Sequence, residues 1–203
     1  MQYRYVAIDE YGSPEMLVMK SGELPPPAVG EVRIRHKAIG FNFIDIYQRQ
    51  GRYPIPLPGR LGFEAAGVVE TVGSGVQDFQ IGDRIAYMNA GNGAYADYRN
   101  VPADKLVTLP DTISDEAAAS LFFKGMTAQY LIRKTFPVKS GDLLIVHAAA
   151  GGVGQILTRW ATALGAIVIG TTGSPTKRDI ALEAGCKEVI DLNNPEWTEH
   201  FLH

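Results

Sequence analysis

The sequence lacks the residues that several classes of protein require. A single cysteine, Cys186, permits neither an internal disulfide nor a multi-thiolate metal site, and it fits a reducing, cytoplasmic setting. No basic excess is present: the formal net charge is −3, which argues against nucleic acid as the main partner. No signal-peptide-like stretch opens the chain, and the longest apolar run, Leu143–Ala150, is too short to span a bilayer. We expect a soluble protein.

The 203-residue sequence divides into two parts with different secondary-structure patterns. Up to about Pro110, short apolar or alternating runs are separated by glycine and proline, a pattern typical of a barrel-like β domain. A short helix over Phe43–Gln48 interrupts it. The predicted strands are Tyr3–Ile8, Glu31–Ile39, Ala65–Val72, Arg84–Tyr87 and Tyr95–Tyr98.

After Pro110 the pattern indicates alternating helices and strands. Ser114 begins one helix with acidic residues in its first turn, and a second helical stretch covers Lys124–Lys134. Ser174 should cap a later helix that has Pro175 at its first position. This order predicts half of a doubly wound parallel sheet. Its elements are the strands Leu143–Val146, Ala166–Gly170 and Lys187–Ile190 and the helices Gly152–Leu164 and Pro175–Ala184.

A glycine-rich turn joins the first of these strands to its helix. Against the pattern G-x-G-x-x-G, Ala149 takes the first place, and Gly151 and Gly154 take the other two. Such a turn lets backbone N–H groups approach a pyrophosphate at a helix N-terminus. The alternative is a tight turn that binds nothing. The position of the turn, after a buried strand and before a helix, favours nucleotide binding.

The end of the second predicted strand indicates which cofactor would bind. NAD-binding folds place an Asp or Glu there, whereas Gly170–Ser174 contains no acid and is followed by Lys177 and Arg178. Cations without a nearby carboxylate suit a 2′-phosphate, so we expect NADP(H). In the alternative interpretation, these side chains are solvated charges in the first turn of a helix, where cations are unfavourable.

Several motifs, in order along the chain, resemble those of NADPH-dependent quinone oxidoreductases related to ζ-crystallin, within the medium-chain dehydrogenase/reductase superfamily. They are Asn42–Asp45, Gly62–Val69, Val72–Val76, Gly82–Arg84, Gly93–Ala96, Phe123–Ala128 and His147–Gly154. The resemblance implies a fold that combines α/β and β parts. A GroES-like β-barrel catalytic domain (residues 1–123) would be followed by an incomplete Rossmann domain that binds NADP (residues 124–203). Members of the family continue well beyond the position that matches His203.

Residues that are absent from these motifs predict a zinc-independent enzyme with no metal site. Zinc alcohol dehydrogenases of the superfamily have histidine at the position of Phe63 and cysteine at that of Asn42, and they carry a four-cysteine lobe. Without a Lewis acid nothing lowers the pKa of an alcohol, whereas a quinone accepts a hydride with less help.

The resemblance also implies roles for individual residues. Asn42, Asp45, Tyr47 and Tyr53 would line the substrate side, with the two tyrosines hydrogen-bonded to the quinone oxygen and Asn42 fixing the nicotinamide. From the pattern alone, Tyr47 is a packed helix residue and Tyr53 a turn residue. The implied cofactor contacts are Thr127, Tyr130, Ala149, Gly151, Gly152, Val153, Gly154, Gly173, Ser174 and Lys177. The sequence departs from the family at Arg159, Thr162 and Leu192, and we interpret His36 and His147 as strand residues.

Three functions from different classes remain open. The first is reduction of a quinone, or of an activated enone by the same hydride chemistry. The second is a catalytically incomplete NADP(H)-binding fragment, because the second half of the nucleotide domain would be absent. The third, binding of single-stranded RNA, is disfavoured by the acidic balance. Relatives would form homodimers, and an exposed edge at Leu143–Val146 would favour association.

Overall fold

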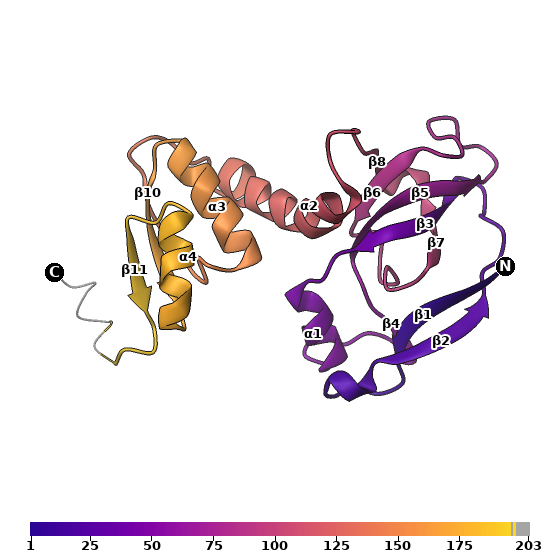
Figure 1. Ribbon diagram of the computed structural model, residues 1–203, viewed down its shortest axis with the longest axis horizontal. Coiled ribbons are helices and arrows are strands. Elements are labelled where there is room, and N and C mark those ends of the chain that lie inside the picture. The colour runs from indigo at the N-terminus through magenta and orange to yellow at the C-terminus, as the bar shows by residue number, and fades with distance from the viewer. Residues whose placement is uncertain (196, 198–203) are drawn as a thin grey trace. The chain divides into compact units, whose positions relative to one another are not determined.

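The computed structural model of the protein describes residues 1–195 and 197, and it divides the chain into two compact units, residues 1–123 and 124–203 (Figure 1). Helix α2 (Asp115–Tyr130) contributes its first half to the first unit and its second half to the other. No helix in the described part of the chain is long and apolar enough to cross a membrane.

The first unit is built on a five-stranded antiparallel sheet with the strand order β7-β3-β5-β6-β8. Its strands alternate, so that one side chain in two enters a shared core and the next points away. The core consists of Val32, Ile34, Ala65, Val69, Ile85, Tyr87, Ala94, Val101 and Leu106. The strands are β3 (Glu31–Ile39), β5 (Glu64–Val72), β6 (Arg84–Met88), β7 (Tyr98–Pro102) and β8 (Leu106–Thr108).

A smaller antiparallel sheet completes this unit, in the order β2-β1-β4. Its strands are β1 (Gln2–Ile8), β2 (Val18–Glu23) and β4 (Gly59–Arg60). Helix α1 (Phe43–Arg49) follows β3, and 3-10 turns lie at Pro14–Met16 and Ala103–Lys105.

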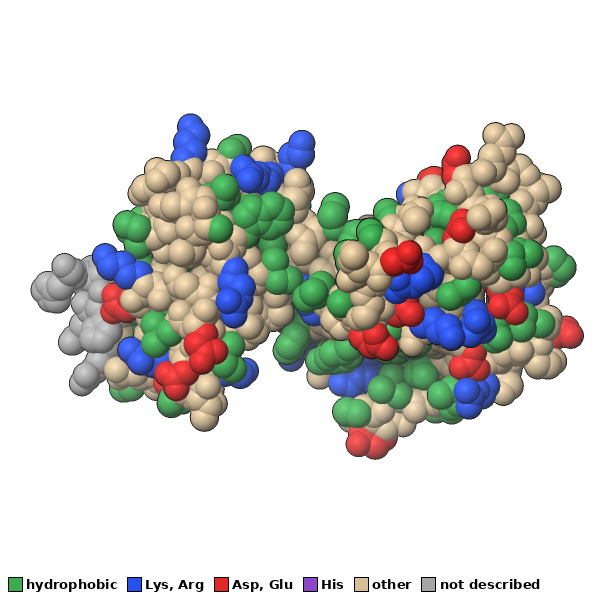
Figure 2. All heavy atoms as spheres, turned by 45° about the horizontal axis from the view of Figure 1, so that its top comes forward, with side chains coloured by type: hydrophobic (Ala, Val, Ile, Leu, Met, Phe, Trp, Pro, Cys, Tyr) green, Lys and Arg blue, Asp and Glu red, His purple; other side chains and the backbone are tan. Residues whose placement is uncertain are grey.

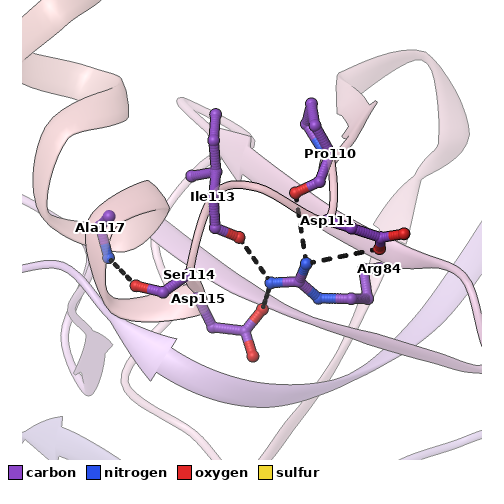
Figure 3. A network of polar contacts seen from close by, with 7 residues as sticks. All are labelled: Arg84, Pro110, Asp111, Ile113, Ser114, Asp115 and Ala117. Carbon is purple, nitrogen blue, oxygen red and sulfur yellow. Dashed lines mark hydrogen bonds and ion pairs between the residues drawn. The ribbon is translucent and has the colours of Figure 1, made fainter.

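The segment between β8 and α2 is fixed by one arginine of the five-stranded sheet (Figure 3). The guanidinium of Arg84 donates to the carbonyl oxygens of Pro110 (3.3 Å) and Ile113 (2.8 Å) and to Oδ1 of Asp115 (2.8 Å). The Ser114 hydroxyl accepts from the N–H of Ala117 at 3.1 Å, which caps the new helix. These bonds set the point at which α2 leaves the sheet.

The second unit is a parallel sheet in the order β11-β10-β9 with helices in its crossovers (Figure 1). Valines of all three strands, Val146, Val168 and Val189, share its core with Ala161 and Ala181 of the helices. The elements are β9 (Leu143–Val146), α3 (Gly152–Ala163), β10 (Ile167–Thr172), a 3-10 turn (Pro175–Lys177), α4 (Arg178–Glu183) and β11 (Glu188–Asp191).

Strand β9 forms one edge of this sheet within the described residues. Leu143 and Ile145 point to the same side of the strand and are 65% and 50% exposed. The exposed side of β9 is therefore apolar, and association through its edge stays a prediction.

Three sequence predictions were wrong in detail. The segment Tyr95–Tyr98 is not a continuous strand: Ala96 forms an isolated bridge to Tyr5, and β7 begins only at Tyr98. The separate helix over Lys124–Lys134 is instead the continuation of α2, which ends in a π-helical turn at Leu131–Thr135. Ser174 occupies the N-cap position, but its hydroxyl is hydrogen-bonded to that of Thr176 (2.7 Å) instead of capping.

Candidate functional site

The first group of candidate residues lies at the start of α1. Asn42 is the N-cap residue, and its backbone N–H donates to Oδ2 of Asp45 at 2.9 Å. The side-chain amide of Asn42 donates in the opposite direction, to Oε1 of Glu64 at 2.8 Å. Both contacts are buried, so Asn42 is held through its backbone and its side chain together.

Asp45 lies below the surface and accepts from three segments. In addition to Asn42, the hydroxyl of Tyr95 donates to Oδ2 (2.9 Å) and the N–H of Gly62 donates to Oδ1 (3.2 Å). Burial raises the pKa of the Asp45 carboxyl, and these three hydrogen bonds oppose that rise. Burial and the neighbouring Asp45 raise the pKa of Tyr95, which keeps its hydroxyl a donor. Asp45 therefore connects α1 to the segments around Gly62 and Tyr95.

Glu64 is a second buried carboxylate, on β5, that the sequence analysis did not single out. Its Oε2 accepts from the backbone N–H of Phe123 at 2.7 Å, and its Oε1 accepts from Asn42. A Cβ atom on Gly40 would overlap this side chain. Glycine is therefore required where the chain leaves the end of β3 and passes close to Glu64 at the start of β5. The signal in the sequence is an acid inside the apolar run Gly62–Val69, where a charge is costly unless it is partnered.

Tyr47 and Tyr53 are brought together beside α1. Their ring centroids lie 5.5 Å apart in an edge-to-face arrangement, and Phe43 packs on Tyr47 at 5.9 Å. The turn after α1 fixes this pair, because the N–H groups of Arg52 and Tyr53 donate to the carbonyl oxygen of Tyr47. Phe43 and Tyr53 are 68% and 57% exposed. We call Phe43, Tyr47 and Tyr53 the aromatic cluster; the guanidinium of Arg52 lies over the ring of Tyr47, 5.8 Å from its centroid, and the exposed rings of Phe43 and Tyr53 are accessible to a ligand.

The glycine-rich turn forms a close-packed entry to α3. Ala148 adopts a positive φ of 50°, and its carbonyl oxygen accepts from the N–H of Gly151, the N-cap residue, at 2.7 Å. A Cβ atom on Gly154 would overlap that oxygen and lie 2.8 Å from the Cα of Ala149. Ala149 is fully buried against Gly170 of β10, so its methyl group faces the sheet and not the solvent.

The first turn of α3 has the features of an anion site. Within the described part of the chain, the backbone N–H groups of Gly152, Val153 and Gly154 donate to no other atom, as expected of the first residues of a helix. Gly152 lies at the surface, and the aliphatic part of Lys124 lies against it. These donors and the positive end of the helix suit a phosphate.

The carboxyl end of β10 carries the remaining candidate residues. Gly173 has open space where a side chain would stand, and its carbonyl oxygen accepts from the side-chain amide of Asn193 at 2.5 Å. Lys177 and Arg178 are exposed and form no ion pair among the residues that the structure describes. The structure thus gathers Gly173, Ser174 and Lys177 after β10.

The other predicted residues fall in separate places. Thr127 and Tyr130 lie one turn apart on α2. Arg159 and Leu192 are exposed, and the Thr162 hydroxyl donates to the carbonyl oxygen of Gly185 at 3.3 Å.

The two histidines differ in environment. His36 lies in β3, where its Nδ1 donates to the carbonyl oxygen of Ala96 (2.7 Å) and its Nε2 accepts from the Tyr87 hydroxyl (2.9 Å). Burial lowers the pKa of His36 to about 4, so the ring is neutral. His147 directly follows β9 and contacts the Thr171 hydroxyl at 3.0 Å.

The described residues contain no cluster of three or more histidine, cysteine or acidic side chains that would hold a metal ion. The ring of Phe63, at the position where zinc enzymes have a ligand, packs near Phe123 at 6.1 Å. Zinc independence stays a prediction.

Comparison with known proteins identifies both parts of this architecture. Residues 28–111 match the alcohol dehydrogenase GroES-like domain. A quinone oxidoreductase of Salmonella typhimurium is 50% identical over 195 residues, which are 96% of this chain and 60% of that protein. The chain is thus similar to quinone oxidoreductases of the medium-chain dehydrogenase/reductase superfamily over about three fifths of their length. The predicted combination of a GroES-like β domain and a Rossmann-type parallel sheet is thereby confirmed.

Two further relatives are relevant to the cofactor and the substrate of the candidate site. The crystal structure of Escherichia coli quinone oxidoreductase complexed with NADPH superposes with a TM-score of 0.94 at 45% identity and covers 97% of this chain and 61% of that chain. A 2-haloacrylate reductase of a Burkholderia species is 43% identical over 95% of this chain and 60% of its own length. The chain spans about 60% of the length of the curated relatives it matches.

Proposed function

We propose that this protein takes part in NADPH-dependent reduction of quinones. The observation that carries the proposal is the first turn of α3, where Gly154 packs on the turn and the N–H groups of Gly152 and Val153 stay open to an anion. Residues 124–203 would be the NADP-binding half-domain, and residues 1–123 the catalytic domain. The NADPH bound in the related Escherichia coli enzyme supports this assignment.

The residues of the second unit fit NADP(H). The pyrophosphate would lie on Gly151, Gly152, Val153 and Gly154; the N–H groups of the last three have no competing partner among the described residues. A 2′-phosphate would lie near Ser174, Lys177 and Arg178, because these cations have no ion-pair partner there and β10 ends without an acid. When bound, NADPH supplies the hydride for the reaction. We include Ala149, Gly173, Thr127 and Tyr130 in the proposed cofactor site.

The aromatic cluster provides what a planar, electron-poor acceptor needs. The exposed rings of Phe43 and Tyr53 can stack on a quinone ring, with Tyr47 between them. Reduction leaves a phenolate-type oxygen on the substrate, and the hydroxyls of Tyr47 and Tyr53 are the donors that would hydrogen-bond and protonate it. Asn42 would orient the nicotinamide from its fixed position at the start of α1.

A second candidate function is reduction of an activated enone by the same residues. The 2-haloacrylate reductase at 43% identity favours this class, since its substrate by name is an electron-poor alkene. A third candidate is an NADP(H)-binding protein that lacks turnover.

We also propose a cytoplasmic location, in keeping with the single buried Cys186, and a homodimer. Nucleic acid is not the proposed partner: basic and acidic side chains are interspersed on the face drawn in Figure 2.

The proposal is tested by titrating the purified chain with NADPH and NADH in a calorimeter and then adding 1,4-benzoquinone while NADPH absorbance is followed. We expect NADPH to bind more tightly than NADH and its absorbance to fall when the quinone is added. NADPH binding without turnover, of either the quinone or an activated enone, would favour the binding-protein alternative. Absence of NADPH binding would refute the proposed cofactor site.

A further inference from the structure

The hydrogen bonds of Asp45 extend beyond what a helix cap requires. A cap at the start of α1 needs only the contact between Asp45 and the N–H of Asn42. Two more donors arrive from distant parts of the sequence: Gly62, 17 residues away, and the hydroxyl of Tyr95, 50 residues away. Together these two contacts tie α1 to two loops of the first unit. Forming each of them costs conformational entropy, because it fixes segments that are far apart in the sequence.

The loop that carries Tyr95 is itself tightly held. The N–H groups of Gly93 and Tyr95 donate to the carbonyl oxygen of Leu61, and His36 donates to the carbonyl oxygen of Ala96. Gly62 has a φ of +97°, and a Cβ atom there would lie 2.6 Å from the ring of Tyr95. The hydroxyl of Tyr95 therefore reaches Asp45 from a rigid base, and only glycine at residue 62 leaves room for it.

On the other side, Asp45 and Glu64 hold Asn42 between them. Asp45 accepts from the backbone N–H of Asn42, and Glu64 accepts from its side-chain amide. The aromatic cluster begins at Phe43, the residue after Asn42, and its Tyr47, five residues after Asn42 on the same helix, is fixed by the turn after α1. A shift of α1 would thus displace Asn42 and Tyr47 together.

We propose that Asp45 and Tyr95 are positioning residues that hold α1, and with it Asn42 and Tyr47, in the geometry that substrate reduction requires. Neither side chain needs to touch the substrate for this role. Asp45 is buried, and all of its hydrogen bonds named above go to the protein. This inference rests on the proposed reductase function for its catalytic consequence, but its structural part can be tested without any turnover.

The number of hydrogen bonds that Asp45 can accept depends on its state of charge. A carboxylate can accept from three donors, whereas a protonated carboxyl has fewer acceptor sites and would compete with the Tyr95 hydroxyl as a donor. Burial raises the pKa of Asp45, the hydrogen bonds from Asn42, Tyr95 and Gly62 lower it, and the nearby Glu64 raises it again, so that the net shift is upward.

The structural test compares Tyr95→Phe with a matched control, Tyr87→Phe. Both changes remove one phenolic hydroxyl in the first unit, but that of Tyr87 bonds to His36 of β3, whereas that of Tyr95 bonds to Asp45 of α1. Amide hydrogen exchange is then measured for Tyr47 to Gln50, at the end of α1. We expect exchange there to be roughly tenfold faster in Tyr95→Phe than in Tyr87→Phe. Equal exchange rates in the two variants would overturn the proposal.

If Tyr95→Phe does not fold, amide hydrogen exchange in the unmodified protein tests the proposal instead. The N–H of Gly62 and the amides of α1 should then open with one common free energy, because the same carboxylate holds them. Independent opening of α1, at a lower free energy than Gly62, would contradict the proposal.

The kinetic test separates positioning from loss of folded protein. In Tyr95→Phe, KM for 1,4-benzoquinone should rise roughly tenfold, because Tyr47 is displaced, while KM for NADPH changes less than about twofold. A smaller folded fraction would lower kcat and leave both KM values unchanged, and that result would refute the positioning role. If the unmodified chain shows no turnover, the proposed function fails, and the exchange comparison alone then decides on Asp45 and Tyr95.

Discussion

Gly154 lies against the carbonyl oxygen of Ala148, so closely that a Cβ atom on Gly154 would overlap that oxygen. The contact seats α3 on the turn before it and leaves the first N–H groups of the helix open. The same relationship makes the proposed cofactor site sensitive to a single methyl group.

We therefore predict that Gly154→Ala destabilises the second unit by about 1–3 kcal/mol, since overpacking forces the backbone to move. NADPH affinity should fall about tenfold or more, since a loss of about 1.4 kcal/mol in binding free energy corresponds to a factor of ten. The matched control is Gly125→Ala, in helix α2, where a new Cβ atom meets nothing within 4 Å. It should be neutral or stabilise by about 0.5–1 kcal/mol. Urea unfolding and calorimetry measure both, and equal behaviour of the two variants would contradict the close-packing argument.

The preference for NADPH should depend on the cations after β10. Lys177→Ala is expected to weaken NADPH binding roughly tenfold, because a charge-assisted hydrogen bond to phosphate contributes about 1.5–3 kcal/mol. NADH affinity should stay the same, since NADH lacks the 2′-phosphate. Lys187→Ala is the control: it removes an exposed lysine of the same unit that stands at the opposite end of the strands, just before β11. Calorimetric titration with each cofactor is the measurement, and a parallel loss for NADPH and NADH in Lys177→Ala would exclude a 2′-phosphate contact.

Stability should fall in acid through His36. Burial lowers the pKa of this histidine to about 4, whereas an unfolded chain has a value of about 6.5. The unfolded state therefore binds the proton first, so the stabilisation is complete above about pH 6.5 and is lost as the pH falls toward 4. The loss amounts to roughly 3 kcal/mol at most, from 1.36 kcal/mol per pKa unit. His36→Gln cannot titrate and should lose less stability between pH 7 and 4.5 in urea unfolding. Identical pH slopes for the two proteins would rule out His36 as the cause.

The sequence predicted the second unit better than the first because its signals are local. The apolar run Leu143–Val146, the glycines of the turn and the following helix stand next to one another, and the strand was predicted with its observed bounds. Strand β3 was likewise predicted as Glu31–Ile39, from an apolar alternation that lies wholly within it.

The misjudged parts depend on partners far along the chain. Residues 95–98 have the composition of a strand, but their pairing with β1 is limited to an isolated bridge between Ala96 and Tyr5, and the hydroxyl of Tyr95 bonds to Asp45. Glu64 and Tyr95 were not predicted as site residues for the same reason: each matters only through a residue more than twenty positions away, and no local period reveals such a pair. The roles of Asn42, Asp45, Tyr47 and Tyr53 came from family resemblance and stay proposals.

The exposed edge of the parallel sheet should control association. Ile145 is half exposed on β9, whose outer side has no strand partner among the residues described. We predict that the chain associates as its concentration rises and that Ile145→Lys weakens this, because a charge on an edge strand opposes pairing. Ile81→Lys is the matched control, an isoleucine that is 70% exposed in the loop between β5 and β6. Sedimentation at several concentrations measures the effect. If both variants associate like the unmodified protein, β9 is not the contact.

Two Arg–Asp pairs of nearly equal length should differ in importance. Arg84 reaches Asp115 at 2.8 Å and also donates to the carbonyl oxygens of Pro110 and Ile113, with only part of its side chain exposed (Figure 3). Arg4 reaches Asp97 at 2.9 Å, but on the open surface, where water and salt screen the charges. Arg84→Ala leaves two carbonyl oxygens and a carboxylate without this donor, so we expect a loss of about 2 kcal/mol in the free energy of unfolding.

Arg4→Ala, the control for this prediction, should leave the urea midpoint almost unchanged. Because Arg84 sets the start of α2, Arg84→Ala should also speed amide exchange at Ala117 and Ala118, whose N–H groups bond to Ser114 in the first turn. Arg4 contacts no part of that turn in the bonds above, so its removal should leave these amides protected. Equal destabilisation by the two alanine variants, or unchanged exchange at Ala117 in Arg84→Ala, would show that α2 starts where it does without the arginine.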